Sequence, residues 1–261
     1  MATAILWFRR DLRLRDHPAL TAATERHDAV AGVFVIDPRL WGSAGTARRA
    51  WLAACLRSLD ESMGGRLVLR HGHPEDVIPR LAAELDAESV LVTGESTPYG
   101  TTRDRRVAEA LDEDGVSFVE TGTPYAVAPG TVQNKSGDPY RVFTPFSRAW
   151  RDLPVDQPLP APKVSWIEAD SHDRARGMLE RAGDSGDTDL SLPEAGEDAA
   201  VARWQDFVED DLADYADARD RPGDDRTSRM SPYLRFGVVH PRQLLAQVRS
   251  HAGEGRRTYE S

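Results

Sequence analysis

Residues 6–18, LWFRRDLRLRDHP, place four arginines and two aspartates directly after a run of apolar residues. If the apolar run is a buried strand, these charges lie at its carboxyl end, where open α/β sheets bind their ligands. A strand-to-helix loop with internal ion pairs would have the same composition. The stretch is therefore a candidate binding edge, and a solvated loop is the alternative.

A second polar stretch, residues 224–237, reads DDRTSRMSPYLRFG. The hydroxyl groups of Thr227, Ser228 and Ser231 surround the guanidinium of Arg229, and Ser231 followed by proline fits the start of a helix. Hydroxyl donors, a guanidinium and a helix N-terminus together suit a diphosphate group. A plain helix cap with surface polarity is the alternative.

The elements that would position these stretches alternate between strand and helix up to about residue 122. Short β-branched or aromatic runs predict five strands, at residues 4–8, 29–36, 66–70, 89–93 and 116–119. Amphipathic stretches between them predict helices, of which 46–63 is the clearest, and Pro74 fits the first turn of another. The alternation predicts an α/β fold of Rossmann-like type, with a doubly wound, parallel, five-stranded sheet and helices on both faces.

The character of the chain changes after this α/β part. Residues 123–150 are loop-rich, and residues 153–197 hold many Pro, Gly and Asp residues with little periodicity, as in a long surface connection. Helical spacing resumes near Ala199, along Val201, Trp204, Val208, Leu212 and Tyr215. We therefore expect an α/β domain at 1–125, an interdomain linker at 126–197 and the incomplete beginning of a helical domain at 198–261.

The charge balance is acidic and poor in lysine. The net charge is −10, and of 33 basic residues only Lys135 and Lys163 are lysine. This composition suggests adaptation to strong salt, although a GC-rich genome would also favour arginine. An acidic total argues against indiscriminate binding of nucleic acid, but it leaves room for a local basic face.

The composition also bounds the class of protein. The single cysteine, Cys55, excludes an intramolecular disulfide and a cysteine-rich zinc site, and we predict no metal. No apolar run approaches the length of a membrane span, and the first ten residues do not form a signal peptide. We expect a cytoplasmic, monomeric protein.

Three stretches together resemble the photolyase/cryptochrome family. Residues 7–14 (WFRRDLRL) are similar to the opening of those proteins, residues 141–146 (RVFTPF) to a middle block, and residues 227–231 (TSRMS), with FG after them, to the flavin phosphate-binding segment. The resemblance implies an α/β antenna domain, a long linker and an all-helical domain that holds FAD. It also implies light-dependent repair of cyclobutane pyrimidine dimers in DNA by electron transfer from reduced FAD.

The resemblance carries over to individual residues of the helical part. It implies that FAD contacts Tyr215, Thr227, Ser228, Arg229, Met230 and Ser231. Met230 stands where leucine is usual, a change of similar volume. Tyr215 could instead be the last core residue of its helix. Arg219 matches a basic residue that touches the backbone of UV-damaged DNA, and the alternative is a solvated arginine paired with Asp220.

The antenna chromophore is suggested by residues 98–104, PYGTTRD, which resemble the deazaflavin-using branch of the family. That branch implies a pocket formed by Val35, Asp37, Arg48 and Glu95, with methenyltetrahydrofolate as the alternative chromophore. Glu95 stands where the branch favours aspartate, so the chromophore stays open. Arg48 would pair with a phosphate or carboxylate tail of the chromophore. The alternative is an exposed helix residue with no role in binding.

Members of the family continue past residue 261 with further flavin contacts and a chain of tryptophans. We therefore expect a truncated piece with no catalytic residue of its own, which alone would neither hold FAD firmly nor repair DNA. A cryptochrome-type blue-light photoreceptor without repair activity is the first alternative. The second is a stand-alone α/β module that binds a chromophore or nucleotide and does no catalysis.

Overall fold

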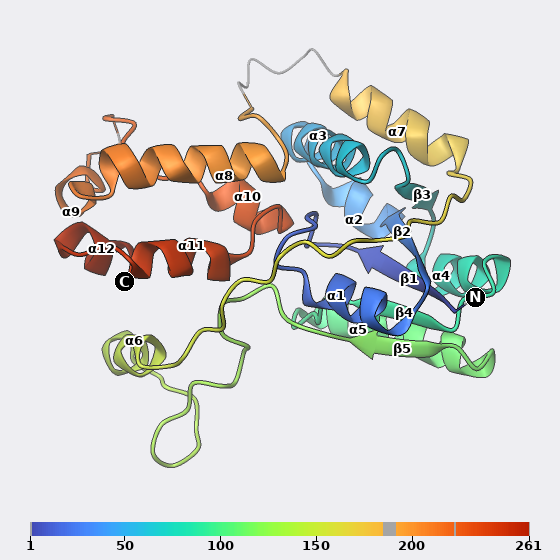
Figure 1. Ribbon diagram of the computed structural model, residues 1–261, viewed down its shortest axis with the longest axis horizontal. Coiled ribbons are helices and arrows are strands. Elements are labelled where there is room, and N and C mark those ends of the chain that lie inside the picture. Colours follow the sequence, from blue (N-terminus) through green and yellow to red (C-terminus); the bar gives the residue numbers. More distant parts are fainter. Residues whose placement is uncertain (1, 185–191, 222, 261) are drawn as a thin grey trace.

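The computed structural model describes residues 2–184, 192–221 and 223–260 (Figure 1). A five-stranded sheet forms its centre, in the order β3-β2-β1-β4-β5, and every neighbouring pair of strands is parallel. The strands are β1 (Thr3–Phe8), β2 (Ala29–Ile36), β3 (Val68–His71), β4 (Ser89–Val92) and β5 (Ser117–Glu120). The predicted sheet is confirmed, and no predicted strand end is displaced by more than two residues.

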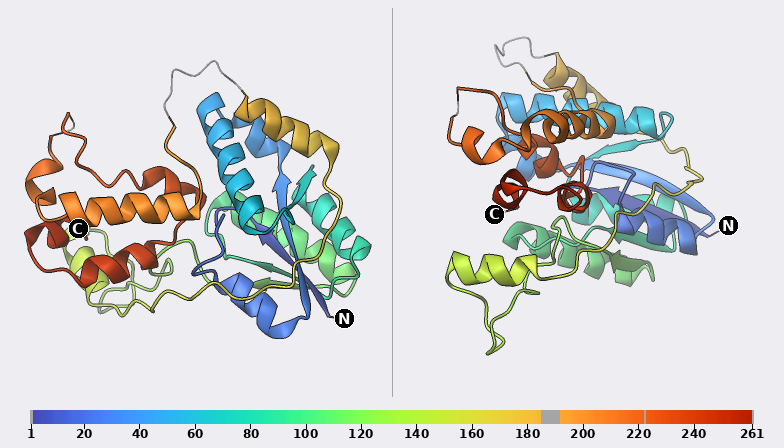
Figure 2. Two further views of the ribbon diagram at one scale, coloured as in Figure 1. Left: turned by 45° about the horizontal axis from the view of Figure 1, so that its top comes forward. Right: turned by 60° about the vertical axis from the view of Figure 1, so that its left-hand side comes forward.

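Helices cover both faces of the sheet because the strands are apolar on both sides (Figure 2). Along β1, Leu6 and Phe8 join one hydrophobic core, whereas Ile5 and Trp7 join the other. The first core contains α1 and α3, and the second contains α4 and α5. These helices are α1 (Pro18–Arg26), α3 (Thr46–Ser62), α4 (Pro74–Glu84) and α5 (Pro98–Glu113).

The strand order has a switch point at β1, which lies between β2 and β4. The connections from β1 run outward in opposite directions on its two sides, so a crevice opens at the carboxyl ends of the central strands. The loops after β1, β2 and β4 meet at this edge. This is where residues 9–16 follow β1, as the sequence predicted.

The connecting segment contains two helices that the sequence analysis did not predict, α6 (Phe143–Arg151) and α7 (Asp173–Gly183). Helix α7 packs against α3 and buries Ala175, Leu179 and Ala182. The buried residues of α7 are spaced as in a helix, but the charged residues and the glycine between them make this pattern hard to recognise in the sequence. Residues 185–191 of the expected linker lie outside the described part of the chain.

The connection also covers an open edge of the sheet. Strand β3 pairs with β2 only from Val33 onward, so the first half of β2 lacks a neighbour on that side. Val30 donates its N–H to the carbonyl of Ser165 (3.0 Å) and accepts from the N–H of Ile167 (2.9 Å). The linker therefore supplies the missing hydrogen bonds of an edge strand.

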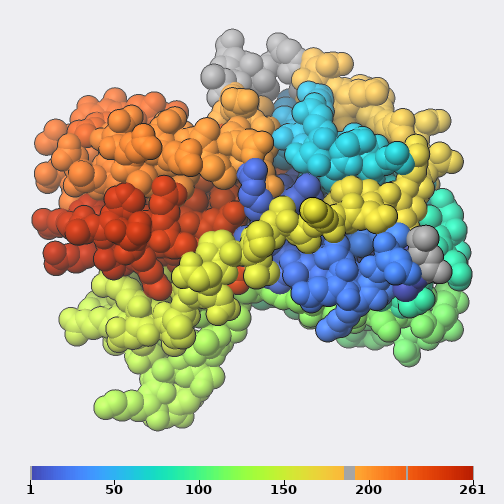
Figure 3. All heavy atoms as spheres, viewed as in Figure 1, coloured from blue at the N-terminus to red at the C-terminus, as the bar shows by residue number. Residues whose placement is uncertain are grey.

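The C-terminal part is helical, as predicted. It consists of α8 (Glu197–Asp206), a π-helical turn (Phe207–Asp211), α9 (Tyr215–Ala218), α10 (Ser231–Phe236), α11 (Pro241–Arg249) and α12 (Glu254–Tyr259). Trp204, Val208 and Leu212 are buried along the predicted stripe. These residues share one core with α3, where Trp51 meets Tyr233 edge-on at 5.4 Å between ring centroids. The space-filling view shows the two parts in contact (Figure 3).

A buried polar joint connects the loop after β1 to the start of α11. The carboxylate of Asp16 is fully buried, pairs with Arg242 and accepts the N–H of Leu159 (3.0 Å). Arg13, also buried, donates to the backbone carbonyls of Asp16 (2.8 Å) and Gly237 (3.1 Å). These contacts fix the position of the loop after β1 relative to the start of α11, although the two are far apart in the sequence.

His240 completes this joint as the residue before α11. Its Nε2 lies 2.8 Å from the carbonyl of Thr123, and its Nδ1 accepts the N–H of Arg242 (3.2 Å). Nε2 is then the protonated nitrogen, and it donates to Thr123. Burial lowers the pKa of His240, which favours this neutral form.

Within the described ranges, no helix is long and apolar enough to cross a membrane. No group of His, Cys, Asp and Glu residues there could hold a metal ion. Cys55 is buried in the core, and burial raises the pKa of its thiol to about 12. The thiol is therefore inert at neutral pH.

Candidate functional site

The first candidate site is a pair of adjoining cavities at the carboxyl ends of β1, β2 and β4. Each has a volume of about 210 Å³. Residues at the ends of β1 and β2 line both cavities, whereas residues after β4 line only the second. Val35, Asp37 and Arg48 line the first cavity, and Val35, Asp37 and Glu95 line the second. The structure thus brings the four residues of the predicted antenna pocket together at the switch point of the sheet.

Asp37 sits where β2 ends and α2 (Pro38–Ser43) begins. One carboxylate oxygen caps α2 by accepting the N–H of Arg39 (2.9 Å), and the other accepts the hydroxyl of Tyr99. Burial and the adjacent Asp37 carboxylate both raise the pKa of Tyr99. Tyr99 therefore stays protonated as a donor, and the two side chains form one fixed wall between the strand ends.

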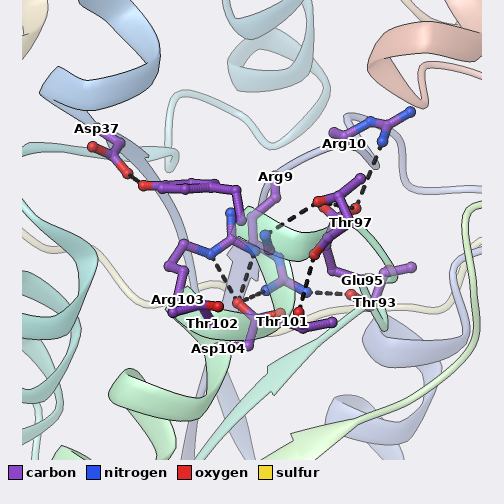
Figure 4. A network of polar contacts seen from close by, with 12 residues as sticks. Arg9, Arg10, Asp37, Thr93, Glu95, Thr97, Thr101, Thr102, Arg103 and Asp104 are labelled. Atoms are coloured by element: carbon purple, nitrogen blue, oxygen red, sulfur yellow. Dashed lines mark hydrogen bonds and ion pairs between the residues drawn. The ribbon is translucent and has the colours of Figure 1, made fainter.

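Two residues that line the second cavity, Arg9 and Arg103, form a charged layer with Asp104 (Figure 4). Arg9 and Arg103 both reach Asp104, each at 2.7 Å, and Arg9 also donates to the carbonyl of Thr93. The two guanidinium groups lie 4.8 and 4.9 Å from the ring centroid of Trp7. Asp104 and the ionised Asp11 beside Arg9 balance the charges of the two guanidinium groups, so attraction between opposite charges holds this layer together.

Further cations surround the opening of the cavities. Arg235 of α10 lines both of them together with Arg10, while Arg48 lines the first. Burial, with the nearby charges of Arg10 and Arg48, lowers the pKa of Arg235, so these cations destabilise one another. Glu95 lies 3.6 Å from Arg10 and offsets part of this repulsion. The arrangement fits a ligand that carries a phosphate or carboxylate group.

Arg48 is exposed and has no ion-pair or hydrogen-bond partner within the described ranges. The cavities are also lined by Arg10, Arg235 and Tyr99, which were not predicted from the sequence. Arg10 lies in the arginine-rich stretch that was singled out, so a signal existed. No local pattern could have found Arg235, because its position depends on the docking of α10 against the sheet.

The second candidate site is the predicted diphosphate segment, residues 227–231, which precedes and begins α10. Arg203 of α8 holds it by donating to the carbonyls of Thr227 (2.8 Å) and Ser228 (3.3 Å), a positioning role that the sequence did not reveal. The hydroxyl of Ser228 lies 3.0 Å from that of Tyr259. Three hydroxyls and a guanidinium within five residues provide donors that suit a diphosphate.

The expected cap at Ser231 is wrong. Met230 occupies the N-cap position, and no side chain caps α10. The chain turns sharply just before, where Arg229 adopts a left-handed conformation with φ of 53°. Arg229 is exposed and pairs with Asp225, whereas Met230 is buried in the core. The turn thus directs the guanidinium outward and the thioether inward.

Tyr215 lies in an aromatic cluster beside this segment. Its ring is 5.5 Å from that of Phe207 and 5.2 Å from that of Tyr259, and Trp204 adjoins both of these rings. Tyr215 is half-buried, so it packs on the core and still offers a face to a ligand. Tyr259 links the cluster to Ser228, which brings the predicted FAD residues of α9 and the diphosphate segment together.

Arg219, the predicted DNA contact, follows α9. Its N–H donates to the carbonyl of Tyr215 (3.1 Å), so the two residues are one helical turn apart, as expected. The guanidinium is exposed and lies 3.7 Å from the carboxylate of Asp220. This is the pairing that the sequence analysis raised as the alternative, and an exposed pair of this kind is easily exchanged for a phosphate.

Known proteins match the chain over its whole length. The DNA photolyase family profile matches residues 4–163. The deoxyribodipyrimidine photo-lyase of Thermus thermophilus is 38% identical over 99% of the chain and 57% of its own length. An uncharacterized 31.6 kDa protein of a Synechococcus species is 35% identical over 93% of the chain and 87% of its own length.

A class III photolyase of Agrobacterium tumefaciens has the same fold. It superposes with a TM-score of 0.87 at 31% identity and covers all of this chain and 56% of its own. The chain spans about half the length of the curated photo-lyases it matches. The profile match, the identities and the shared fold show that this chain belongs to the DNA photolyase family.

Proposed function

We propose that the whole protein repairs cyclobutane pyrimidine dimers in UV-damaged DNA, with light as the energy source and reduced FAD as the electron donor. Membership of the photolyase family carries this proposal, together with the donor-rich segment 227–231 beside Tyr215. This chain contributes the antenna-binding part and the first flavin contacts. Bound FAD in its reduced form would supply the electron that light transfers to the dimer.

The chain's own residues would position the flavin. Thr227, Ser228 and Ser231 would donate hydrogen bonds to the diphosphate, and Arg229 would exchange Asp225 for it. Tyr215 would contact the cofactor through its ring. Met230, whose side chain is buried in the hydrophobic core, would fix the backbone of the segment. The pocket for the flavin ring lies outside these residues, so we expect the chain alone to retain little FAD.

Flavin content tests this division. The 261-residue chain should purify with far less than one FAD per chain. The chain joined to the remaining C-terminal part of the Thermus thermophilus photo-lyase should hold about one, because the ring pocket adds most of the buried contact area. Absorbance of the denatured, released flavin measures both. Near-stoichiometric FAD on the chain alone would contradict the proposed division.

We propose that the paired cavities bind the antenna chromophore, a deazaflavin or, as the alternative, methenyltetrahydrofolate. Arg48→Ala should weaken binding of a deazaflavin by about 1.5–3 kcal/mol, the range for a hydrogen bond to a charged group. Its fold should not change, because the side chain is exposed and unpaired within the described ranges. Fluorescence titration measures the affinity.

The matched control for this substitution is Arg57→Ala, an exposed arginine on the same helix and away from the cavities. The control should bind the chromophore as tightly as the unmodified chain. Equal affinities of all three proteins would remove Arg48 from the site.

We propose that Arg219 contacts a DNA phosphate in the whole protein. Arg219→Ala should lower affinity for damaged and undamaged DNA alike and reduce the slope of log affinity against log salt by about one unit. Flavin content should stay the same. Arg105→Ala removes an exposed arginine of α5 as the control. If Arg219→Ala leaves the slope of log affinity against log salt unchanged, Arg219 does not contact DNA and only pairs with Asp220.

A further inference from the structure

Residues 126–151, which we call the basic arm, project from the body of the protein. The arm begins after the loop that follows β5 and ends with α6. In Figures 1 and 3 it forms a protrusion below the helical part, separate from the sheet. None of its residues is fully buried, so the hydrophobic core does not account for its composition.

The arm reverses the charge of the rest of the chain. It carries four basic residues, Lys135, Arg141, Arg148 and Arg151, against one acidic residue, Asp138, while the whole chain has a net charge of −10. All four cations are exposed, and none forms an ion pair within the described ranges. An unpaired positive element on an acidic protein provides a local attraction for a polyanion.

The tip of the arm is an ordered turn. Asn134 accepts the N–H groups of Ser136 (2.8 Å) and Asp138 (3.0 Å) through its side-chain oxygen, and Gly137 supplies the positive φ of 83° that the turn requires. A bridge between residues 133 and 139 closes it. Lys135 therefore stands at the end of a preformed hairpin, which lowers the entropy lost when a partner binds.

Apolar side chains are exposed among the cations. Val142 is 63% exposed and Phe143 is 62% exposed, directly after Arg141. Cations interleaved with exposed aromatic groups are the means by which proteins follow a nucleic-acid backbone and contact sugars and bases. DNA is the polyanion of the proposed function, and its phosphates match the four exposed cations of the arm.

We propose that the basic arm is a second DNA-binding element, in which the four cations contact backbone phosphates and Phe143 contacts a sugar or base. This inference rests on the proposed function, because DNA is its substrate. It differs from the Arg219 contact in its position and in the number of charges. The arm extends the proposed footprint on DNA beyond the phosphate contact of Arg219.

The test measures binding of a short, undamaged DNA duplex to the 261-residue chain in the dark, by fluorescence anisotropy at several salt concentrations. The combined variant Lys135→Gln, Arg141→Gln, Arg148→Gln and Arg151→Gln should reduce the slope of log affinity against log salt by about 3–4 units. Between roughly 50 and 200 mM salt, the unmodified chain should then lose about 10²-fold more affinity than the variant.

A control variant removes the same charge from exposed cations of the α/β domain and of the linker outside the arm, by Arg26→Gln, Arg57→Gln, Arg80→Gln and Lys163→Gln. Its slope should stay within about one unit of the unmodified chain. Equal slopes for the arm variant and the control would overturn the proposal, as would no binding by the unmodified chain at the lowest salt. An acidic protein would then be the better partner for the arm.

Phe143→Ala tests the apolar contact separately. It should weaken binding of a single-stranded oligonucleotide about tenfold without moving the salt slope, because aromatic rings stack on unpaired bases, whereas Phe143→Trp should keep the affinity. An unchanged affinity of Phe143→Ala would remove the ring from the proposal. Undamaged DNA, darkness and the absence of FAD keep these results independent of repair, so the proposed function and the arm can fail separately.

Discussion

Replacing Asp16 with asparagine should lower the free energy of unfolding by about 3–5 kcal/mol, because the change leaves the charge of Arg242 without its buried counterion. Asparagine has the same shape and tolerates the left-handed conformation that Asp16 adopts, with φ of 51°. The substitution therefore tests the charge and not the backbone. Urea unfolding followed by circular dichroism measures the change.

The control for Asp16 is Asp198→Asn, which breaks the exposed pair with Arg15 and should change stability little. The pH dependence gives a second readout. Burial opposes ionisation of Asp16, but the hydrogen bonds from Arg242 and from the N–H of Leu159 outweigh it, and the pKa lies below its usual value. The unmodified chain should lose this stabilisation as pH falls below about 4, and the variant should not. An asparagine variant as stable as the unmodified chain would contradict the role of the joint.

Gly237→Ala should destabilise the protein by about 2–5 kcal/mol. Gly237 ends α10 with φ of 64°, and a Cβ there would overlap the carbonyl oxygen of Arg10 and lie 2.7 Å from the Cα of Asp11. Backbone atoms cannot move aside as a side chain can, so α10 would shift away from the loop after β1. That shift would carry Arg235 away from the cavities.

Both consequences of Gly237→Ala can be measured. Thermal unfolding reports the loss of stability, and titration with a deazaflavin reports the displacement of Arg235. The control is Gly42→Ala in α2, where the added methyl group would meet no atom within 4 Å. Equal stabilities of the two variants would show that α10 does not need this close approach.

The sheet could be predicted because its signals are local. Strand β2 is apolar at all eight positions, and Gly, Pro or Asp residues mark most of the element ends. Helix α7 could not be predicted in the same way, because its buried positions are three small or aliphatic residues among charged ones. Its stability comes from packing on α3, and periodicity measures packing only indirectly.

Some residues of the two sites could be predicted from the sequence, and others could not. Val35, Asp37, Arg48 and Glu95 came from a family resemblance, and the fold places them around the same pair of cavities because three strand ends converge there. Arg203 and Arg235 act on sites from distant parts of the chain. No spacing rule relates them to their targets, so only the folded chain identifies them.

The expected cap at Ser231 failed for a related reason. Ser-Pro is a common start of a helix, but the left-handed turn at Arg229 moves the cap position to Met230. That turn depends on burial of the methionine, which the local sequence does not encode. The hydroxyl of Ser231 remains available to a ligand, so the diphosphate proposal does not depend on the cap.

Light-dependent loss of thymine dimers tests the central claim most directly. The chain joined to the C-terminal part of the Thermus thermophilus photo-lyase should remove dimers from UV-irradiated DNA under blue light and not in the dark. The intact Thermus thermophilus protein is the positive control. A fusion that holds about one FAD per chain but leaves the dimers intact under illumination would contradict repair and favour a photoreceptor.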